Sequence, residues 1–256
     1  MGSNGPKNLD LRGPPIYPAG PFSPGQVPLF TILTLFPEAV QSYLSIGVLG
    51  LAVKRKLIQV EIVDFRDFSH DRHRTVDDRP FGGGPGMVLR PEPVAEAVEW
   101  VEERHGSHRR IVLDPAGTPF VQSHARELCT AERTLLLAGR YEGFDERLLQ
   151  LLEFEPFSIG DFVLSGGELP ALCLLEATAR LIPGVLGDER SAEEDSFQDG
   201  NTLDHPHFTR PRVFRGLSVP QVLLQGDHAE IAAWRKKEAL KRTKNRRTTL
   251  NEPDKA

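Results

Sequence analysis

The feature that most constrains the fold is an alternation of strand-like and helix-like segments between residues 29 and 182. Short apolar runs of strand length occur at 29–35, 57–64, 110–113, 134–138 and 155–159. Segments with helical spacing separate or follow them, at 38–54, 94–104, 123–129, 144–152 and 169–182. This order predicts an α/β domain with a mainly parallel sheet. Ligands of such sheets bind outside the carboxyl ends of the strands. We therefore expect one ligand to contact the loops at 113–117, 139–143 and 159–167.

Two of these loops are rich in glycine, which lets a ligand lie against backbone. Residues 158–170 read SIGDFVLSGGELP, and residues 139–143 read GRYEG. A phosphate cradle is disfavoured, because the first loop has no Lys at the P-loop spacing and carries Asp161 and Glu168. Backbone amides and carbonyls between apolar side chains suit an adenine ring instead. The sequence thus favours a neutral or positively charged ligand, with Glu142 aimed at it. The alternative for GRYEG is an ordinary strand-to-helix turn.

The segment 66–91 is rich in charge and glycine and has no hydrophobic period, so we expect a long functional loop. It contains four arginines between 66 and 79 and four glycines between 82 and 86. This composition suits a segment that closes over a phosphodiester backbone and a base, although a solvated charged loop is the simpler interpretation. His70 and His73 have no accompanying ligand pattern, which disfavours a metal site here.

The two ends of the chain differ in character from the middle. Residues 1–27 hold six prolines and little to bury, which predicts a disordered leader. An acidic stretch at 188–204 is expected to be a flexible linker, and 205–256 a small, mostly helical unit in which Asp227 caps a helix at 228–241. Although the net charge is −5, basic residues cluster near the end of the chain. This cluster predicts either a solvated helix face or an RNA contact. Its members are Arg235, Lys236, Lys237, Lys241, Arg242, Lys244, Arg246 and Arg247.

Composition places the chain among ordinary globular proteins. Its 256 residues suffice for one large domain, or for a medium domain with a smaller one. No apolar run has the length that a membrane span needs, and no signal peptide is recognisable. Cys129 and Cys173 are expected to be buried free thiols, which favours a cytoplasmic location.

The motifs together closely resemble the bacterial tRNA (guanine-N1)-methyltransferase family, TrmD. They lie in order between about residues 29 and 247: DRHRTVDDRPFGGGPGM, GRYEGFDER, SIGDFVLSGGELP, IPGVLG, EDSF and HPHFTRP. The resemblance implies an α/β domain of the SPOUT type with a deep trefoil knot at 28–187, followed by a tRNA-binding unit at 205–256. It also implies a homodimer with active sites between subunits, S-adenosylmethionine as methyl donor, and tRNA with guanine at position 37 as acceptor. A Mg²⁺ requirement accompanies the family, but no ligand cluster locates it.

The resemblance also assigns roles to individual residues. Asp195 of EDSF matches the general base that removes the proton from guanine N1, Arg180 matches a cation that stabilises charge on O6, and Glu142 matches an acid near the methyl group. The residues alone allow simpler interpretations, in which Arg180 only offsets a helix dipole and Asp195 is one more solvated acid. The donor is expected to contact Leu113, Gly139, Tyr141, Ile159, Gly160, Asp161, Phe162, Val163, Leu164, Gly166, Gly167 and Pro170.

Two other functions are compatible with parts of the pattern. One is a related SPOUT methyltransferase that modifies a different RNA, such as ribosomal RNA, although the DRPFGGGPGM and HPHFTRP motifs argue against it. The other is an RNA-binding protein with a decayed catalytic site, which the intact glycine loops, Arg180 and Asp195 disfavour.

Overall fold

The computed structural model describes residues 27–187 and 195–251, with side chains up to residue 246. Nearly all of the predicted leader and the first part of the predicted linker therefore lie outside the described residues. The chain divides into two compact units, the first ending at residue 189 and the second beginning at residue 190. Among the described helices, none combines the length and apolar character needed to cross a membrane.

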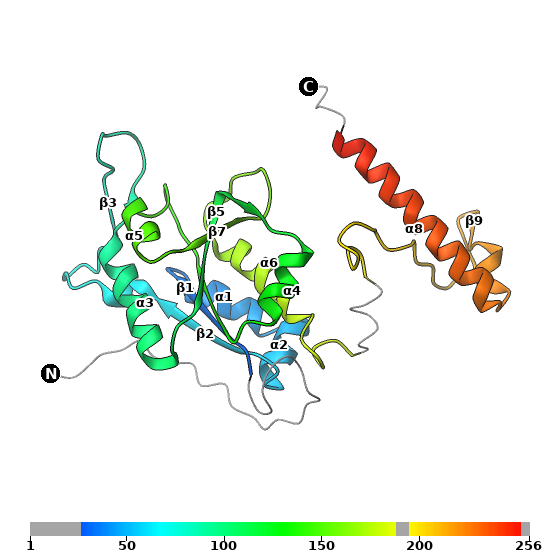
Figure 1. The fold of residues 1–256 in the computed structure, drawn as a ribbon, viewed down its shortest axis with the longest axis horizontal. Coiled ribbons are helices and arrows are strands. Elements are labelled where there is room, and N and C mark those ends of the chain that lie inside the picture. Colours follow the sequence, from blue (N-terminus) through cyan, green and yellow to red (C-terminus); the bar gives the residue numbers. More distant parts are fainter. Residues whose placement is uncertain (1–26, 188–194, 252–256) are drawn as a thin grey trace. The chain divides into compact units, whose positions relative to one another are not determined.

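The first unit is built on a five-stranded sheet in which every neighbouring pair is parallel (Figure 1). The strand order is β2-β1-β6-β5-β7. The strands are β1 (Leu29–Thr34), β2 (Gln59–Asp64), β5 (Arg109–Pro119), β6 (Arg133–Leu137) and β7 (Glu155–Ser158). The predicted α/β class with a mainly parallel sheet is confirmed.

Helices cover both faces of the sheet, as expected when strands are apolar on both sides. On one face Phe30 and Ile32 pack with α1 (Pro37–Leu44), α2 (Gly47–Lys54), α4 (Gln122–Cys129) and α6 (Glu168–Ala179). On the other, Leu33 and Val63 pack with α3 (Pro91–His105) and α5 (Glu146–Leu151). Successive side chains of β1 thus pack into two separate hydrophobic cores, one on each face of the sheet, and every residue of that strand is buried.

Three expectations from the sequence need correction. The segment 66–91 is not structureless, because it contains a short 3₁₀ turn, η1 (Phe65–Phe68), and the antiparallel pair β3 (Asp77–Asp78) and β4 (Val88–Leu89). The stretch 113–117 is not a terminal loop. Leu113 and Thr118 both pair with Phe157, so β5 bulges between them and then continues. Finally, the Cys173 thiol is free but exposed, and Cys129 is only half-buried.

The second unit has little regular structure before its long helix. Residues 195–200 form turns, then come the short hairpin β8 (Val213–Phe214) with β9 (Leu217–Ser218), the 3₁₀ turn η2 (Gln221–Leu224) and α8 (His228–Asn251). Asp227 Oδ1 accepts hydrogen bonds from the backbone N–H groups of Ala229 and Glu230 at 2.9 and 3.0 Å. The predicted cap is confirmed, and the helix runs about ten residues beyond the expected end.

Candidate functional site

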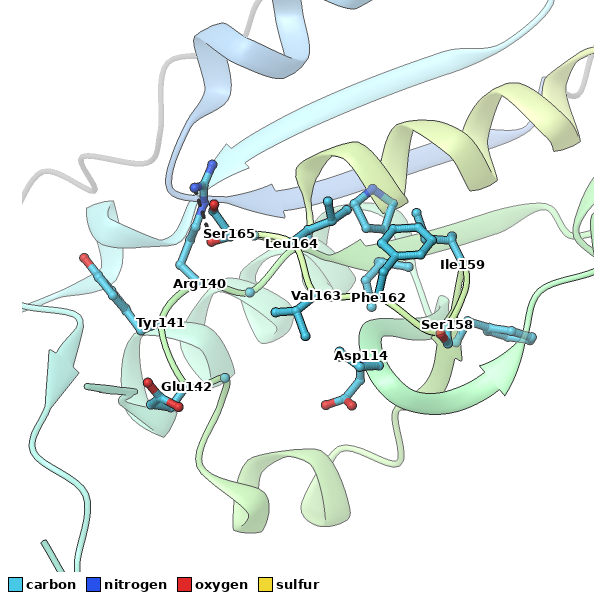
Figure 2. Close-up of a pocket in the computed structure, with 18 of the residues that line it drawn as sticks. Asp114, Arg140, Tyr141, Glu142, Ser158, Ile159, Phe162, Val163, Leu164 and Ser165 are labelled. Carbon is cyan, nitrogen blue, oxygen red and sulfur yellow. Dashed lines mark hydrogen bonds between the residues drawn. The ribbon is translucent and has the colours of Figure 1, made fainter. Parts of the chain in front are cut away.

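The loops at the carboxyl side of the sheet meet around one pocket with a volume of about 300 Å³ (Figure 2). One wall comes from the bulge in β5, a second from the turn after β6, and a third from the segment that links β7 to α6. These are the three segments that the strand pattern selected. Because all five strands are parallel, their carboxyl ends share an edge, and this brings together residues more than forty positions apart.

The pocket contains almost the whole set of predicted donor-binding residues. Only Asp161 is missing from its lining, and that side chain is exposed. The predicted residues that line the pocket are Leu113, Gly139, Tyr141, Ile159, Gly160, Phe162, Val163, Leu164, Gly166, Gly167 and Pro170. Glu142 lines it as well. The other lining residues received no individual assignment from the sequence, although five of them lie in the three predicted loops: Asp114, Pro115, Arg140, Gly143, Phe144, Phe157, Ser158 and Ser165.

Apolar side chains around the pocket are unusually exposed. Val163 is 86% accessible, Tyr141 56%, Phe162 53% and Leu164 39%. Exposed apolar groups in one concave place indicate a ligand with an apolar face. Backbone carbonyls and N–H groups of the same loops supply polar contacts, so the pocket suits a flat heterocycle held at its edge by backbone and on its faces by side chains.

Only one of the three acids that the sequence suggested, Glu142, lines the pocket. Glu168 is only 4% exposed and does not offer its carboxylate to a ligand. Asp114 lines the pocket together with Glu142, and Arg140 is the one basic residue in the lining. Asp114 Oδ1 accepts a hydrogen bond from the N–H of Ala116 at 2.7 Å, which holds the β5 bulge. The lining therefore favours a ligand that carries positive charge.

Glu168 has a structural task at the base of the pocket. Its Oε1 accepts a hydrogen bond from Thr34 Oγ1 at 2.8 Å, and its Oε2 lies 3.0 Å from Arg140 Nη2. Arg140 Nη1 also donates to the carbonyl of Ser165 at 3.3 Å, and its guanidinium lies 4.3 Å from the centre of the Phe36 ring. One buried carboxylate thus ties the turn after β6 to the end of β1 and to the start of α6. A buried ion pair with this many partners fixes the relative positions of these three segments.

Two of the pocket loops approach each other closely at Gly167. Its N–H donates to the carbonyl of Gly139 at 2.8 Å. A Cβ on Gly167 would lie 2.8 Å from Cα of Ala138 and 2.9 Å from N of Gly139. Both atoms belong to backbone, so no side chain can move aside. Only glycine permits this contact.

We expect Gly167→Ala to separate the two loops and to weaken ligand binding by about 5- to 150-fold, since overpacking of this kind costs roughly 1–3 kcal/mol. Gly187→Ala is the matched control, because a Cβ there meets nothing within 4 Å. Isothermal titration with S-adenosylmethionine measures both variants. Equal affinities for the two would contradict the role of this contact, and circular dichroism checks that each is folded.

The glycine-rich segment at 82–87 is joined to the pocket through Glu142. The N–H of Glu142 donates to the carbonyl of Met87 at 3.0 Å, and the N–H of Leu89 donates to the carbonyl of Gly143 at 2.8 Å. A Cβ on Gly86 would lie 2.2–2.6 Å from side-chain atoms of Glu142. The position of this acid is thus coupled to the segment, a link that nothing in the sequence signals.

The part of the 66–91 segment that precedes these glycines is held together by its own acidic side chains. Asp71 accepts hydrogen bonds from the N–H groups of His73 and Thr75 at 2.7 and 3.0 Å, and Arg74 pairs with Asp67. His70 pairs with Glu96 on α3 at 2.7 Å, which accounts for it without a metal. Phe81 at the tip is 98% exposed. Of these contacts, the pair with Asp67 is the one that holds an arginine side chain, that of Arg74.

The two remaining predicted catalytic residues are not in the pocket lining. Arg180 is the half-buried residue that follows the last turn of α6, and its N–H donates to the carbonyl of Glu176 at 3.2 Å. Asp195 is the first described residue of the second unit. Both have further interactions of their own. Their assignment as catalytic residues stays a prediction.

In the second unit, α8 presents its basic residues to solvent. The described basic side chains of this helix are all exposed: Arg235, Lys236, Lys237, Lys241, Arg242, Lys244 and Arg246. Two of them also hold the preceding segment. Arg242 Nη1 donates to the carbonyl of Asp204 at 3.1 Å, and the Arg246 guanidinium lies 5.0 Å from the centre of the Phe197 ring.

Comparison with known proteins identifies relatives over most of the chain. Residues 29–253 match the family model described as tRNA (Guanine-1)-methyltransferase TrmD. A tRNA (guanine-N(1)-)-methyltransferase of Dehalococcoides mccartyi is 51% identical over 222 residues, 86% of this chain and 89% of the relative. The protein of the same description from Aeromonas hydrophila is 50% identical over 220 residues, 86% of this chain and 88% of the relative. That from Cronobacter sakazakii is 51% identical over 222 residues, 86% of each.

Proposed function

The chain belongs to the tRNA (guanine-1)-methyltransferase TrmD family, and we propose that it methylates N1 of guanine 37 in tRNA with S-adenosylmethionine as donor. The observation that carries the donor assignment is the pocket itself. It is built from backbone and exposed apolar side chains and lined by Asp114 and Glu142. The donor combines an adenine ring with a sulfonium charge and has no phosphate, which fits these walls.

The residues of the chain act on the acceptor base in complementary ways. Guanine N1 carries a proton and is a poor nucleophile until a base removes it. We assign this proton to the Asp195 carboxylate. As N1 loses its proton, negative charge develops on O6, and a fixed guanidinium from Arg180 stabilises it. N1 then forms its bond to the methyl carbon while the bond from that carbon to sulfur breaks, with Glu142 beside the reacting groups.

A homodimer with active sites between subunits is part of the proposal, together with a trefoil knot in the first unit. The tight contact between Gly167 and Gly139 is compatible with a knot, in which chain segments cross closely. For the dimer, an apolar stripe on α6 provides support. Leu169 and Cys173 are exposed four residues apart, and Tyr43 of α1 donates a hydrogen bond to Glu176, three residues further on. Partial burial, and then Glu176, raise the pKa of the Cys173 thiol, which keeps it uncharged at neutral pH.

We expect Cys173→Arg to convert the dimer to monomers, because it places a long charged side chain in the apolar stripe. Leu151→Arg is the matched control, since Leu151 is 77% exposed on α5, which packs on the opposite face of the sheet. Light scattering after size-exclusion chromatography gives the mass of each variant. A dimer for Cys173→Arg would remove this surface from the interface.

The second unit is proposed to bind tRNA through α8. Its exposed basic side chains suit a phosphate backbone, for which contacts are electrostatic and independent of base sequence. Mg²⁺ has no site that we can propose. It prefers carboxylate and carbonyl oxygens, whereas the metal-compatible cluster found among residues 27–187 and 195–246 contains two imidazoles.

A methyl-transfer assay with unmodified tRNA transcripts tests the proposed function. The expected result is transfer from labelled S-adenosylmethionine to a transcript with guanine at position 37, and none to one with adenine there. Donor binding without transfer to either would point to another RNA, such as ribosomal RNA. Absence of donor binding would contradict the methyltransferase assignment altogether.

A further inference from the structure

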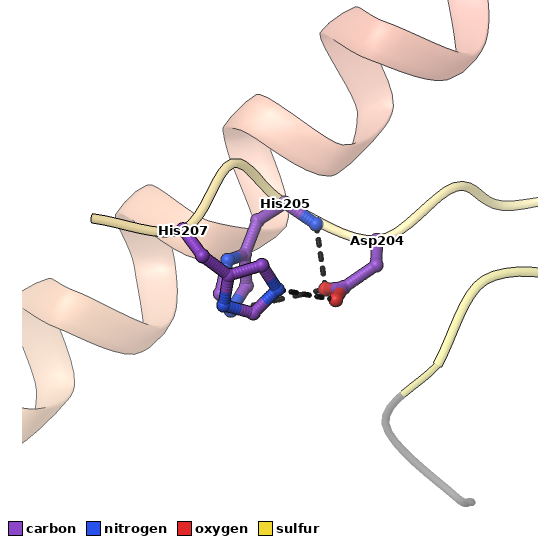
Figure 3. A group of neighbouring side chains, drawn as sticks. All are labelled: Asp204, His205 and His207. Carbon is purple, nitrogen blue, oxygen red and sulfur yellow. Dashed lines mark hydrogen bonds and ion pairs between the residues drawn. The ribbon is translucent and has the colours of Figure 1, made fainter. Parts of the chain in front are cut away.

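We propose that Asp204, His205 and His207 form a binding site for a divalent cation of the Zn²⁺ class in the second unit (Figure 3). One ligand atom from each of these side chains lies within 4.8 Å of the other two. The three residues come from one short segment, the start of the HPHFTRP motif and the residue before it. The proposed function gives the histidines of this motif no role.

The two imidazoles converge on one carboxylate. His207 Nε2 lies 2.7 Å from Asp204 Oδ2, and His205 Nε2 lies 3.8 Å from Asp204 Oδ1. The second distance is too long for a hydrogen bond. In tetrahedral coordination with bonds of about 2.1 Å, ligand atoms lie about 3.4 Å apart. Small side-chain movements therefore bring all three atoms into the coordination sphere of one ion.

A contact on the far side of His205 favours the tautomer that a metal needs. His205 Nδ1 lies 3.2 Å from the carbonyl oxygen of Pro206, so it is placed to donate its proton there. A proton on Nδ1 leaves a lone pair on Nε2, which faces Asp204. Metal-binding histidines characteristically donate their second nitrogen to a carbonyl or carboxylate in this way. The backbone geometry thus prepares one of the imidazoles for coordination.

The donor set determines which ion fits. Two imidazole nitrogens and one carboxylate oxygen are typical ligands of Zn²⁺ and of its neighbours Co²⁺ and Ni²⁺, and a poor set for Mg²⁺. The His207 side chain is 71% exposed, while those of Asp204 and His205 are 23% and 14% exposed. The site therefore opens to solvent on the His207 side, where water completes the fourth position.

The second unit has a structural need for such an ion. Within residues 195–246, no side chain is buried. Units without an apolar core commonly rely on metals or on partners. The segment holds neighbouring parts together: the N–H of Leu203 donates to Thr243 Oγ1 of α8 at 2.9 Å, and the N–H of Asp204 donates to Ser196 Oγ at 3.0 Å. An ion that fixes Asp204 would therefore fix the residue next to Asp195.

Metal titration of the untagged, full-length protein tests the site without reference to catalysis. After treatment with a chelator, the protein is titrated with Co²⁺, monitored by visible absorption, and then with Zn²⁺ in competition. We expect one ion per chain, displaced by Zn²⁺ and not by excess Mg²⁺. His207→Ala and Asp204→Asn are each expected to lower the Zn²⁺ affinity at least about tenfold. Circular dichroism checks their fold.

The control is His228→Ala, which removes an exposed histidine from the start of α8 and is expected to bind Zn²⁺ normally. Hydrogen exchange supplies a second measurement: Zn²⁺ should slow the exchange of the Asp204 amide in the wild type but not in His207→Ala. Equal Zn²⁺ binding by wild type, His207→Ala and Asp204→Asn would show an adventitious ion only. Absence of Zn²⁺ binding at micromolar concentration would leave Asp204 and His207 as an ordinary ion pair. Either result overturns the proposal.

Discussion

Asp195→Asn is expected to lower the rate of methyl transfer by about 10²–10⁴-fold, the usual contribution of a general base. Asparagine has nearly the same shape as aspartate but cannot take up the proton of guanine N1. The donor pocket lies in the first unit and Asp195 in the second, so the affinity for S-adenosylmethionine should not change. Single-turnover kinetics with saturating donor and tRNA isolate the chemical step.

A matched control separates loss of the base from disturbance of the loop that carries it. Asp199→Asn is the control, since Asp199 is exposed in the same loop and only holds a turn, by accepting from the N–H of Asn201 at 2.8 Å. A near-normal rate for Asp195→Asn would remove Asp195 from the role of base.

The sequence predicted the pocket well because two kinds of signal coincide there. Strand periodicity locates the carboxyl ends of β6 and β7, and glycines directly after them mark places where something lies against backbone. Parallel pairing then brings these ends together without any further information. Local sequence patterns, together with the rule that ligands bind at the carboxyl ends of parallel strands, are therefore enough to identify the pocket loops.

The parts that the sequence did not predict depend on long-range contacts. Glu168 looked like a ligand-binding acid, because nothing local shows that Arg140 and Thr34 neutralise and bury it. The bulge in β5 was mistaken for a terminal turn, since Asp-Pro-Ala-Gly is turn-like and the renewed pairing of Thr118 with Phe157 is non-local. Asp195 was selected only through a family motif, because an acid among other acids carries no distinguishing pattern.

The position of Arg180 constrains how the active site is assembled. Gly167 and Pro170 at the start of α6 line the pocket, whereas Arg180 follows the end of that helix. A helix of 12 residues spans about 18 Å at 1.5 Å per residue. An arginine side chain is too short to cross this distance. We therefore expect Arg180 to act on the acceptor at the pocket of the partner subunit of the proposed dimer.

Arg180→Ala should lower the turnover number by about 10²–10³-fold, the effect of removing one group that stabilises a developing oxyanion. Donor affinity should be unchanged, and Arg180→Lys should recover part of the rate because it retains the charge. The decisive measurement uses heterodimers, purified with two different tags, that pair an Arg180→Ala chain with a Gly167→Ala chain, assayed at a donor concentration near the wild-type Kd, where the Gly167→Ala pocket is mostly empty. If Arg180 serves the partner's pocket, one of the two sites has an intact pocket and an intact arginine, and the heterodimer is faster than either parent. If it serves its own pocket, each site lacks one component and the heterodimer is no faster than the Gly167→Ala parent.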